Sequence, residues 1–204
     1  MDLDDFSGID LRESADVTIT QGRTQKVTVT GHGNIIDMLK TNVDNDLWAI
    51  DLGRGCFRDY KIEIVVPNMN TIILSGSGSI NIDDFKNQTN VDLSILGSGK
   101  IELECFEYTK NLDVQISGSG DVIGYDHFDV LKNMDVRISG SGSYDAYPIE
   151  TDNATIKISG SGNCYTTVLD QLDVAISGSG KVRYHGDPKV NKKISGSGSV
   201  RKTD

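Results

Sequence analysis

The stretch Ile116-Ser117-Gly118-Ser119-Gly120 decides the fold, because close copies of it recur along most of the chain. Ser-Gly-Ser-Gly stands at 75–78, 117–120, 139–142, 159–162, 177–180 and 195–198, and a seventh copy carries Leu96 in place of the first serine. The last glycines of successive copies lie 18 to 22 residues apart. Self-similarity at a nearly fixed step of this size indicates a solenoid, in which each repeat packs against its neighbours.

Each repeat follows one pattern of alternating apolar and polar residues. In the segment 112–116, Leu112, Val114 and Ile116 point one way, and the residues between them point the other way. One 20-residue unit cannot bury such a face alone, whereas stacked units can, if each strand pairs in parallel with its equivalent in the next coil. The sequence therefore predicts an all-β, right-handed parallel β-helix of roughly 20-residue coils, with about three short strands in each coil.

The glycines of the repeated motif are expected to form one structural corner of every coil. Glycine suits such a corner because it tolerates the positive φ angles of a sharp bend, and serines hydrogen-bond locally in turns. The predicted corner residues are Gly76, Gly78, Gly97, Gly99, Gly118, Gly120, Gly140, Gly142, Gly160, Gly162, Gly178, Gly180, Gly196 and Gly198.

We expect residues 1–204 to form a single β-helix domain, with irregular N-terminal coils and a cap in 1–70 and the repeat coils in 71–204. Residues 16–20 and 26–30 alternate as half-buried strands do, and they form either a hairpin or two sides of an early coil. Residues 34–40 are the best helical candidate, with Asn34 as its N-cap. Further strands are predicted at 47–52 and 61–66, the second ending at Pro67.

Outward positions of the repeats form rows of like residues. Asp92, Asp113, Asp135 and Asp173 occupy one position, where stacked carboxylates would repel. The neighbouring row can offset part of this repulsion; it holds Ser94, Gln115, Arg137, Lys157, Ala175 and Lys193. In the last repeat an inward valine is replaced by Lys192, which indicates an end of the stack where charge discourages edge-to-edge growth.

No motif in the sequence points to catalysis, a cofactor or a metal. The repeated glycines do not complete Gly-x-Gly-x-x-Gly, and neither the calcium-binding nonapeptide nor the Gly-x-Ser-x-Gly elbow occurs. The three histidines are far apart, and the carboxylates near later corners, such as Glu102 and Glu104, show no catalytic spacing. Three widely spaced cysteines give no metal pattern and no disulfide framework. We therefore expect a protein that is not an enzyme.

Tyrosines follow successive corners, and three of them are candidates for an outward binding strip. Tyr125, Tyr147 and Tyr165 could bind a sugar or a protein, or they could pack under a loop. Cys164 occupies an inward position, which predicts a buried and inert thiol.

Charge and hydropathy exclude several partners. The chain carries a net charge of −10. Residues 181–204 hold seven Lys and Arg against two Asp, so residues 1–180, the acidic body, carry a larger net negative charge than the full chain. An acidic body argues against nucleic-acid binding. No apolar run is long enough to span a membrane, and no signal peptide is present. The start at Met1 is what a trimmed export signal would leave.

The opening residues and the repeats together resemble a known family. Residues 6–10 read Phe-Ser-Gly-Ile-Asp, residues 15–22 read Ala-Asp-Val-Thr-Ile-Thr-Gln-Gly, and Ile-Ser-Gly-Ser-Gly units follow. This combination resembles the putative auto-transporter adhesin, head GIN domain, and covers nearly the whole chain. The resemblance implies a right-handed β-helix in the bacterial envelope, either secreted or behind a lipoprotein signal. It brings no catalytic or binding residues.

Three functions follow as hypotheses. The first is a non-enzymatic cell-surface or envelope β-solenoid, an adhesin that presents an extended face to an unknown protein or glycan. The second is a carbohydrate-binding or polysaccharide-active β-helix. The third is a structural module that assembles end to end as a homo-oligomer, the acidic body of one copy meeting the basic end of another.

Overall fold

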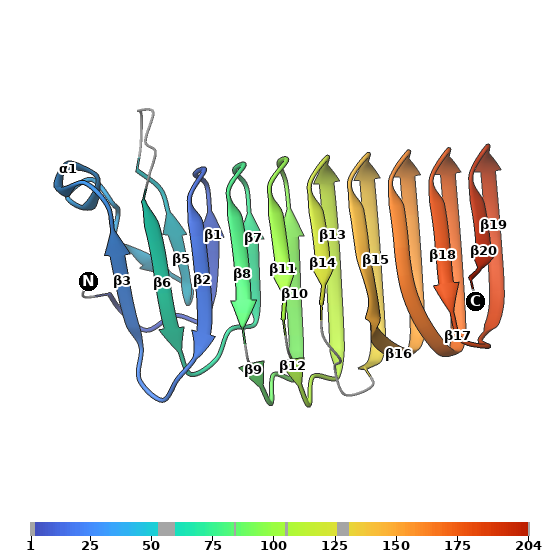
Figure 1. Ribbon diagram of the computed structural model, residues 1–204, viewed down its shortest axis with the longest axis horizontal. Coiled ribbons are helices and arrows are strands. Elements are labelled where there is room, and N and C mark those ends of the chain that lie inside the picture. The colour runs from blue at the N-terminus through green and yellow to red at the C-terminus, as the bar shows by residue number, and fades with distance from the viewer. Residues whose placement is uncertain (1–2, 53–59, 84, 105, 126–130, 204) are drawn as a thin grey trace.

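The protein folds as the predicted right-handed parallel β-helix (Figure 1). The structure is a computed structural model and describes residues 3–52, 60–83, 85–104, 106–125 and 131–203. Two of the three cysteines, Cys56 and Cys105, and one histidine, His127, lie outside the described residues. Within these described ranges, eighteen strands join into one continuous sheet that winds around the core, and two more form a small separate sheet.

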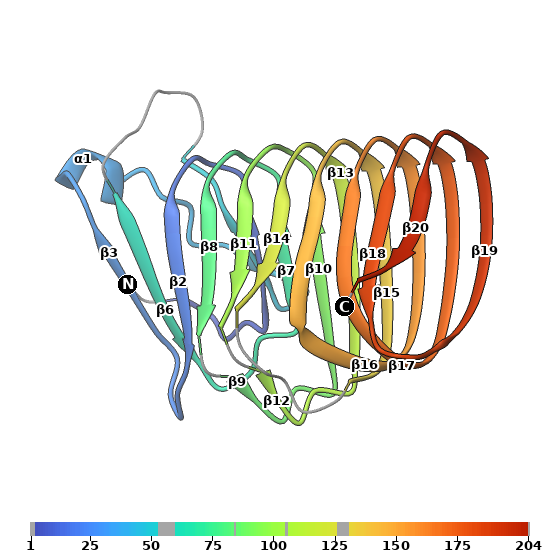
Figure 2. The same ribbon diagram turned by 45° about the vertical axis from the view of Figure 1, so that its right-hand side comes forward.

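Two walls of strands enclose the core, and each coil contributes one strand to each wall (Figure 2). Wall A consists, in spatial order, of β5 (Leu47–Ile50), β1 (Gly8–Leu11), β7 (Thr71–Leu74), β10 (Asn90–Ile95), β13 (Asn111–Gly118), β15 (Leu131–Gly140), the later parts of β16 (Ser143–Gly160) and β17 (Asn163–Gly178), and β19 (Lys189–Gly196). Wall B consists of β3 (Lys26–Thr30), β6 (Lys61–Val66), β2 (Asp16–Gln21), β8 (Ser79–Asp83), β11 (Lys100–Leu103), β14 (Asp121–Gly124), the first parts of β16 and β17, β18 (Lys181–His185) and β20 (Ser199–Lys202).

The repeats stack in register, so that equivalent side chains of successive coils lie over one another. Leu93 pairs with Val114, Val114 with Val136, and the row continues through Ile156 and Val174. All of these side chains are buried. Stacked aliphatic side chains of this kind supply the main favourable term for folding, about 1.5–3 kcal/mol for each fully buried one.

The sequence predicts about three short strands in each coil. Among the described residues, two coils have a separate third strand. Their third strands are β9 (Phe85–Lys86) and β12 (Phe106–Glu107), which pair in parallel as the small second sheet. The rings of Phe85 and Phe106 stack with their centroids 5.7 Å apart. In later coils β16 and β17 run from wall B into wall A without a break, so the third strand merges into a longer one.

The Ser-Gly-Ser-Gly segments do lie at one corner, but positive φ explains only some of the glycines. From Gly118 onward the first glycine of each motif has a positive φ, 138° at Gly118 itself. The second glycine does not, and it is required for a different reason. A Cβ at Gly120 would lie 2.5 Å from the carbonyl oxygen of Gly99 and 2.6 Å from Cγ2 of Ile95. The neighbouring coil therefore excludes any side chain there.

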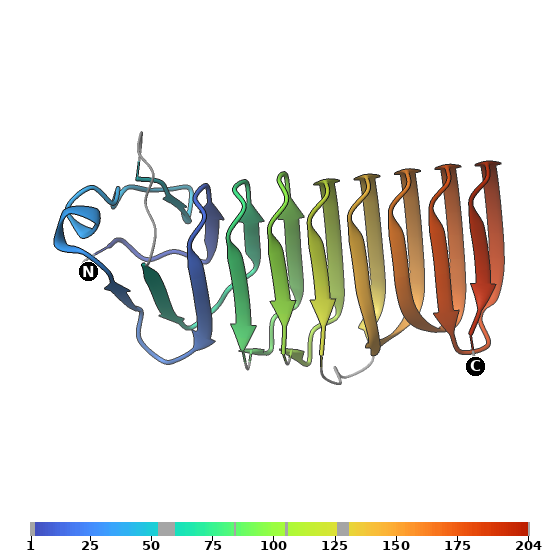
Figure 3. The ribbon, with the colours of Figure 1, turned by 45° about the horizontal axis from the view of Figure 1, so that its top comes forward.

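The N-terminal coils are not stacked in the order of the sequence. β1 lies between β5 and β7, and β2 lies between β6 and β8, so the first coil in sequence is inserted between two later ones (Figure 3). β2 and β3 form neither a hairpin nor two sides of one coil. They flank β6 within wall B, β2 in parallel and β3 antiparallel, so that the backbone N–H and C=O groups on both edges of β6 have hydrogen-bond partners.

A short helical turn and a small hairpin cover this end of the solenoid. The helix α1 (Gly33–Ile36) begins one residue before the predicted N-cap Asn34 and ends four residues before the predicted end at Lys40. β4 (Val43–Asp44) then pairs antiparallel with β5. The indole nitrogen of Trp48, which is fully buried, donates a hydrogen bond to the carbonyl oxygen of Lys40 at 2.9 Å. This bond ties the segment after the helix to the buried strand β5.

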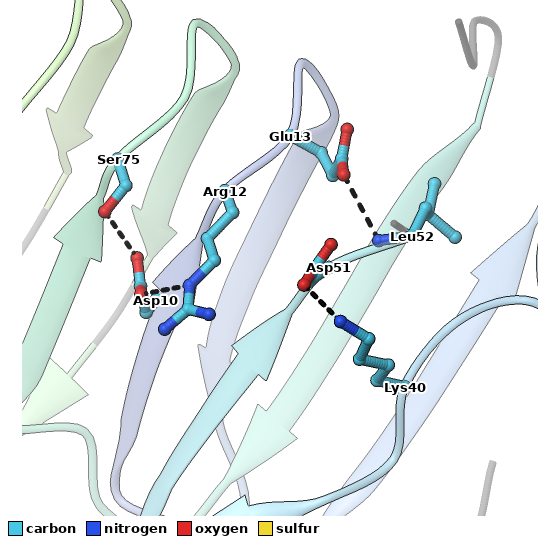
Figure 4. A network of polar contacts seen from close by, with 7 residues as sticks. All are labelled: Asp10, Arg12, Glu13, Lys40, Asp51, Leu52 and Ser75. Atoms are coloured by element: carbon cyan, nitrogen blue, oxygen red, sulfur yellow. Dashed lines mark hydrogen bonds and ion pairs between the residues drawn. The ribbon is translucent and has the colours of Figure 1, made fainter. Parts of the chain in front are cut away.

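Polar contacts at the corner fix the inserted coil to its neighbours (Figure 4). The buried carboxylate of Asp10 accepts hydrogen bonds from Nε of Arg12 and from Oγ of Ser75, both at 2.7 Å. The hydrogen bond from Arg12 to Asp10 is the main cause that raises the pKa of Arg12. On the other side, Glu13 accepts a hydrogen bond from the backbone nitrogen of Leu52 at 3.2 Å.

The C-terminal coil is open, as the replacement of valine by Lys192 predicts. Every residue of β19 is exposed, including Lys192, which is in register with the buried Val174. Val190 and Ile194 are 38% and 37% exposed although they occupy positions that are buried in earlier coils.

Candidate binding surface on wall A

The outer surface of wall A carries four parallel rows of polar side chains, formed by in-register stacking. The asparagine row is Asn90, Asn111, Asn133 and Asn153, and the aspartate row is Asp92, Asp113, Asp135 and Asp173, with Thr155 between the last two. The cationic row is Gln115, Arg137, Lys157, Ala175 and Lys193, and the serine row is Ser117, Ser139, Ser159, Ser177 and Ser195. Successive members lie on adjacent strands, about 4.8 Å apart.

The asparagine row is held by hydrogen bonds that run along the solenoid axis. Nδ2 of Asn111 donates to Oδ1 of Asn90 at 2.7 Å, and Nδ2 of Asn133 donates to Oδ1 of Asn111 at 2.9 Å. At Asn153 the ladder changes partner, and Nδ2 donates to the carbonyl oxygen of Lys132 at 3.2 Å. An amide can donate and accept at once, so an in-register row of asparagines satisfies itself.

Repulsion within the aspartate row is offset by the neighbouring row, as the sequence predicts. Arg137 forms ion pairs with Asp113 at 2.9 Å and with Asp135 at 2.8 Å. Partial burial, followed by the charge of Asp113, raises the pKa of Asp92. Partial burial also raises the pKa of Asp135, against the opposing effect of Arg137. Arg137 therefore holds Asp113 and Asp135 in place.

A groove of about 530 Å³ lies between the cationic row and the serine row. It crosses the strands from β13 to β19, and its edges are formed by residues such as Arg137, Lys157 and Lys193 on one side and Ser139 and Ser177 on the other. Where the larger side chains of the cationic row are interrupted, Ala175 leaves space between Lys157 and Lys193. A second hollow, of about 390 Å³, lies between the asparagine and aspartate rows.

The predicted tyrosine strip lies away from wall A, and the structure brings only two of its members together. The rings of Tyr147 and Tyr165 are 5.7 Å apart, and Tyr147 stacks on His185 at 4.2 Å. Tyr125 is 51% exposed and instead donates a hydrogen bond to Oε1 of Glu102 at 2.7 Å. A binding role for Tyr125, Tyr147 and Tyr165 stays a prediction.

Glu102 is the centre of a small polar cluster on wall B. Its Oε1 also accepts a hydrogen bond from Nζ of Lys100 at 2.9 Å. Partial burial acts to raise the pKa of Glu102, but the hydrogen bonds from Tyr125 and Lys100 outweigh it and the pKa is lowered. The same bonds to Glu102 raise the pKa of Lys100 and of Tyr125. Around neutral pH Glu102 and Lys100 are therefore charged, whereas Tyr125 keeps its proton and donates it in the hydrogen bond.

Other residue types with chemical potential are scattered. Cys164 is fully buried, as predicted, and desolvation raises the pKa of its thiol. His32 is exposed, far from the stacked ring of His185. Within the described ranges no three His, Cys, Asp or Glu side chains come together as metal ligands would. The described residues also contain no helix with the length and hydropathy needed to cross a membrane.

The sequence shows the rows but not the groove. Asparagines stand two residues before the aspartates in three successive repeats, at 90, 111 and 133, and this spacing is a visible signal for an amide ladder beside the aspartate row. The groove depends on side-chain lengths in adjacent rows and on the path of the corner, and neither follows from periodicity alone.

Comparison with known proteins places this chain in a family. The sequence profile of the putative auto-transporter adhesin, head GIN domain, matches residues 5–188. The chain belongs to this family. The match extends from the inserted first coil to the loop before β19, so wall A and its rows lie largely within the head GIN domain. No curated protein shows significant sequence similarity to the chain.

Solved structures of similar proteins share the head GIN fold. A putative adhesin from Bacteroides fragilis is 22% identical, with a TM-score of 0.88 over 98% of this chain and 94% of that one. A putative adhesin from Parabacteroides merdae is 20% identical, with a TM-score of 0.74 over 100% of this chain and 94% of that one. A putative lipid binding protein from Parabacteroides distasonis is 23% identical, with a TM-score of 0.72 over 100% and 95%. At these identities the likeness concerns the fold.

Proposed function

We propose that the protein is a non-enzymatic β-solenoid of the cell envelope or of the secreted fraction, and that it adheres to other surfaces through wall A. The observation that carries the proposal is the groove along the cationic and serine rows, in which each of the five wall A strands from β13 to β19 presents a serine and three of them present Arg or Lys. A ligand with its own repeats can contact such a surface at several coils at once, and weak contacts then add up to strong attachment.

Two further observations support a role in binding. Membership of an adhesin family supports a location where the protein meets other surfaces. The carboxylates of wall A support a non-enzymatic role, because Arg137 is paired with both Asp113 and Asp135 and leaves neither as a free general base. Catalysis by acid and base needs a titratable group within reach of a substrate proton.

Adhesion of coated beads tests the proposal. Beads carrying the chain are washed over immobilised bacterial polysaccharides and over protein-coated surfaces, and retained beads are counted. Ser159→Tyr places a large ring in the groove and is expected to abolish most retention, whereas Lys181→Tyr on the exposed side of wall B is expected to leave it unchanged. Retention that is lost only with Lys181→Tyr, or that never exceeds uncoated beads on any surface, would overturn the proposal.

A further inference from the structure

We infer that the groove between the cationic and serine rows binds a linear, sparsely charged acidic polysaccharide, of the uronate type, lying along the solenoid axis. This inference rests on the proposed adhesive function and names its ligand class. Three features of the groove lead to it: its direction, its charge and its lining.

The direction of the groove excludes strand addition by a peptide. The groove crosses β13, β15, β16, β17 and β19, so it runs perpendicular to the strands. Backbone groups beneath it are used in the parallel ladders that join these strands. A peptide that adds to a sheet needs free backbone groups along a strand edge. A ligand in this groove must bind through side chains alone, which suits a polymer whose own groups are hydroxyls and carboxylates.

The charge of the groove favours an anion at two positions. Arg137 is held by Asp113 and Asp135. Lys157 and Lys193 have no ion pair among the described residues, and both side chains line the groove. They lie two strands apart, about 10 Å, with Ala175 between them. Two carboxylates of a polymer can therefore each meet one ammonium group while the chain passes over Ala175.

The surroundings of the groove select against a densely charged polymer. The aspartate row lies beside the cationic row, and residues 1–180 carry far more Asp and Glu than Lys and Arg. DNA carries one negative charge for each ~1.7 Å of its axis, so it would meet this acidic body at every coil. A polymer with one carboxylate for each sugar has a much lower charge density than DNA, so two of its carboxylates can meet the lysines while fewer of its charges face the aspartates.

The lining of the groove suits a sugar chain. The serine row offers one hydroxyl for each strand, and a hydroxyl both donates and accepts hydrogen bonds. The floor is the backbone of Ile116, Ile138 and Ile158, whose side chains are buried in the core, and the stems of the longer side chains supply apolar surface above it. Lys and Arg stems present apolar surface below their charged ends. Sugar rings combine hydroxyl edges with apolar C–H faces, so they match both parts of this lining.

Calorimetric titration of the full chain with defined oligosaccharides tests the inference. The probes are linear oligogalacturonate, a neutral linear galactan of the same length, and polyglutamate as a peptide with a similar density of carboxylates. We expect oligogalacturonate to bind at low salt at least tenfold more tightly than either of the others, and its binding to weaken as salt is added.

Variants assign the binding to the groove. Lys157→Gln with Lys193→Gln is expected to weaken oligogalacturonate binding at least tenfold, and Ala175→Tyr to abolish it by filling the space between the lysines. Lys61→Gln with Lys181→Gln removes the same charge from exposed positions on wall B and is expected to stay within twofold of the original protein. Thermal melting confirms that each variant is folded.

Three outcomes would overturn the inference. Equal binding of polyglutamate would show general attraction between opposite charges, and equal loss in the wall B pair would place the effect outside the groove. Failure of oligogalacturonate to bind while coated beads still adhere would exclude this ligand and leave the proposed function standing. If the beads also fail to adhere, both proposals fall together.

Discussion

At the scale of single residues, the corner glycines meet two different physical demands. Gly118 needs glycine because its φ of 138° is rarely adopted by other residues. Gly120 needs glycine because the backbone of the neighbouring coil occupies the place where a Cβ would lie. The repeats in the sequence predict the corner. They do not distinguish the two requirements, because both positions are glycine.

Gly120→Ala is therefore expected to destabilise the protein even though no strained φ is involved. The new Cβ would lie 2.5 Å from the carbonyl oxygen of Gly99, so that the two coils must move apart. Overpacking of this kind costs about 1–3 kcal/mol. Chemical denaturation of both forms measures the change in the free energy of unfolding.

Gly33→Ala is the matched control, because nothing lies within 4 Å of a Cβ added at Gly33. It is expected to change the free energy of unfolding by no more than about 0.5 kcal/mol. If Gly120→Ala were as harmless as Gly33→Ala, the close stacking of coils at the corner would be wrong.

At the scale of strands, the rows on wall A show how far repeat periodicity reaches. The in-register pairing of Asp92 with Asp113 and of Asp113 with Asp135 follows from their equal position in the repeats. The double ion pair of Arg137 does not follow from this position. It requires the guanidinium to contact Asp135 on its own strand and Asp113 on the neighbouring strand. Side-chain reach is decided by rotamers and by neighbours, which a single sequence does not record.

Asp92→Asn is expected to stabilise the protein at neutral pH. Partial burial and Asp113 raise the pKa of Asp92, so at this site the folded protein binds a proton more tightly than the unfolded chain. The contribution of Asp92 to the free energy of unfolding therefore falls as pH rises from the ordinary aspartate pKa through the raised folded value. Above that value the asparagine removes a like-charge contact worth about 0.2–1 kcal/mol.

Thermal melts between pH 3 and pH 8 measure this effect. The melting temperature of Asp92→Asn should exceed that of the original protein at pH 7, and the two should converge at the acid end of the range. Glu63→Gln, at an exposed position on wall B, is the control and should show no such convergence. A lower melting temperature for Asp92→Asn at pH 7 would mean that the Asp92 carboxylate stabilises the folded protein, and would contradict the prediction.

At the scale of the whole molecule, the order of coils is the feature that the sequence hides. The sequence predicts the strand content, the repeat length and the glycine corner. It does not predict that β1 is inserted between β5 and β7. Each of these three strands has an apolar inward face, so several stacking orders satisfy the same pattern. Specific contacts select one of them, among them the hydrogen bonds from Ser75 to Asp10 on one side of the inserted coil and from Leu52 to Glu13 on the other.

The open coil at β19 bears on whether copies of the protein stack end to end. Its backbone edge is exposed, and Val190 and Ile194 present apolar surface that a further coil would cover. Lys192 stands between them at an inward position, where an incoming strand would bury its charge. A charge placed inward on an edge strand is a known way to prevent pairing between edges. We therefore expect the original protein to sediment as a monomer at both low and high salt.

Lys192→Val should remove this protection. The valine completes an apolar row with Val190 and Ile194, and self-association is expected to appear at micromolar concentrations in sedimentation velocity. Lys193→Val deletes the same charge from the same strand but points outward, so it should remain monomeric. Salt separates the alternatives, because apolar pairing persists at high ionic strength whereas contact between a basic end and an acidic body is screened. If the original protein already associates at low salt and dissociates at high salt, the two ends attract by charge, and Lys192 belongs to an assembly interface.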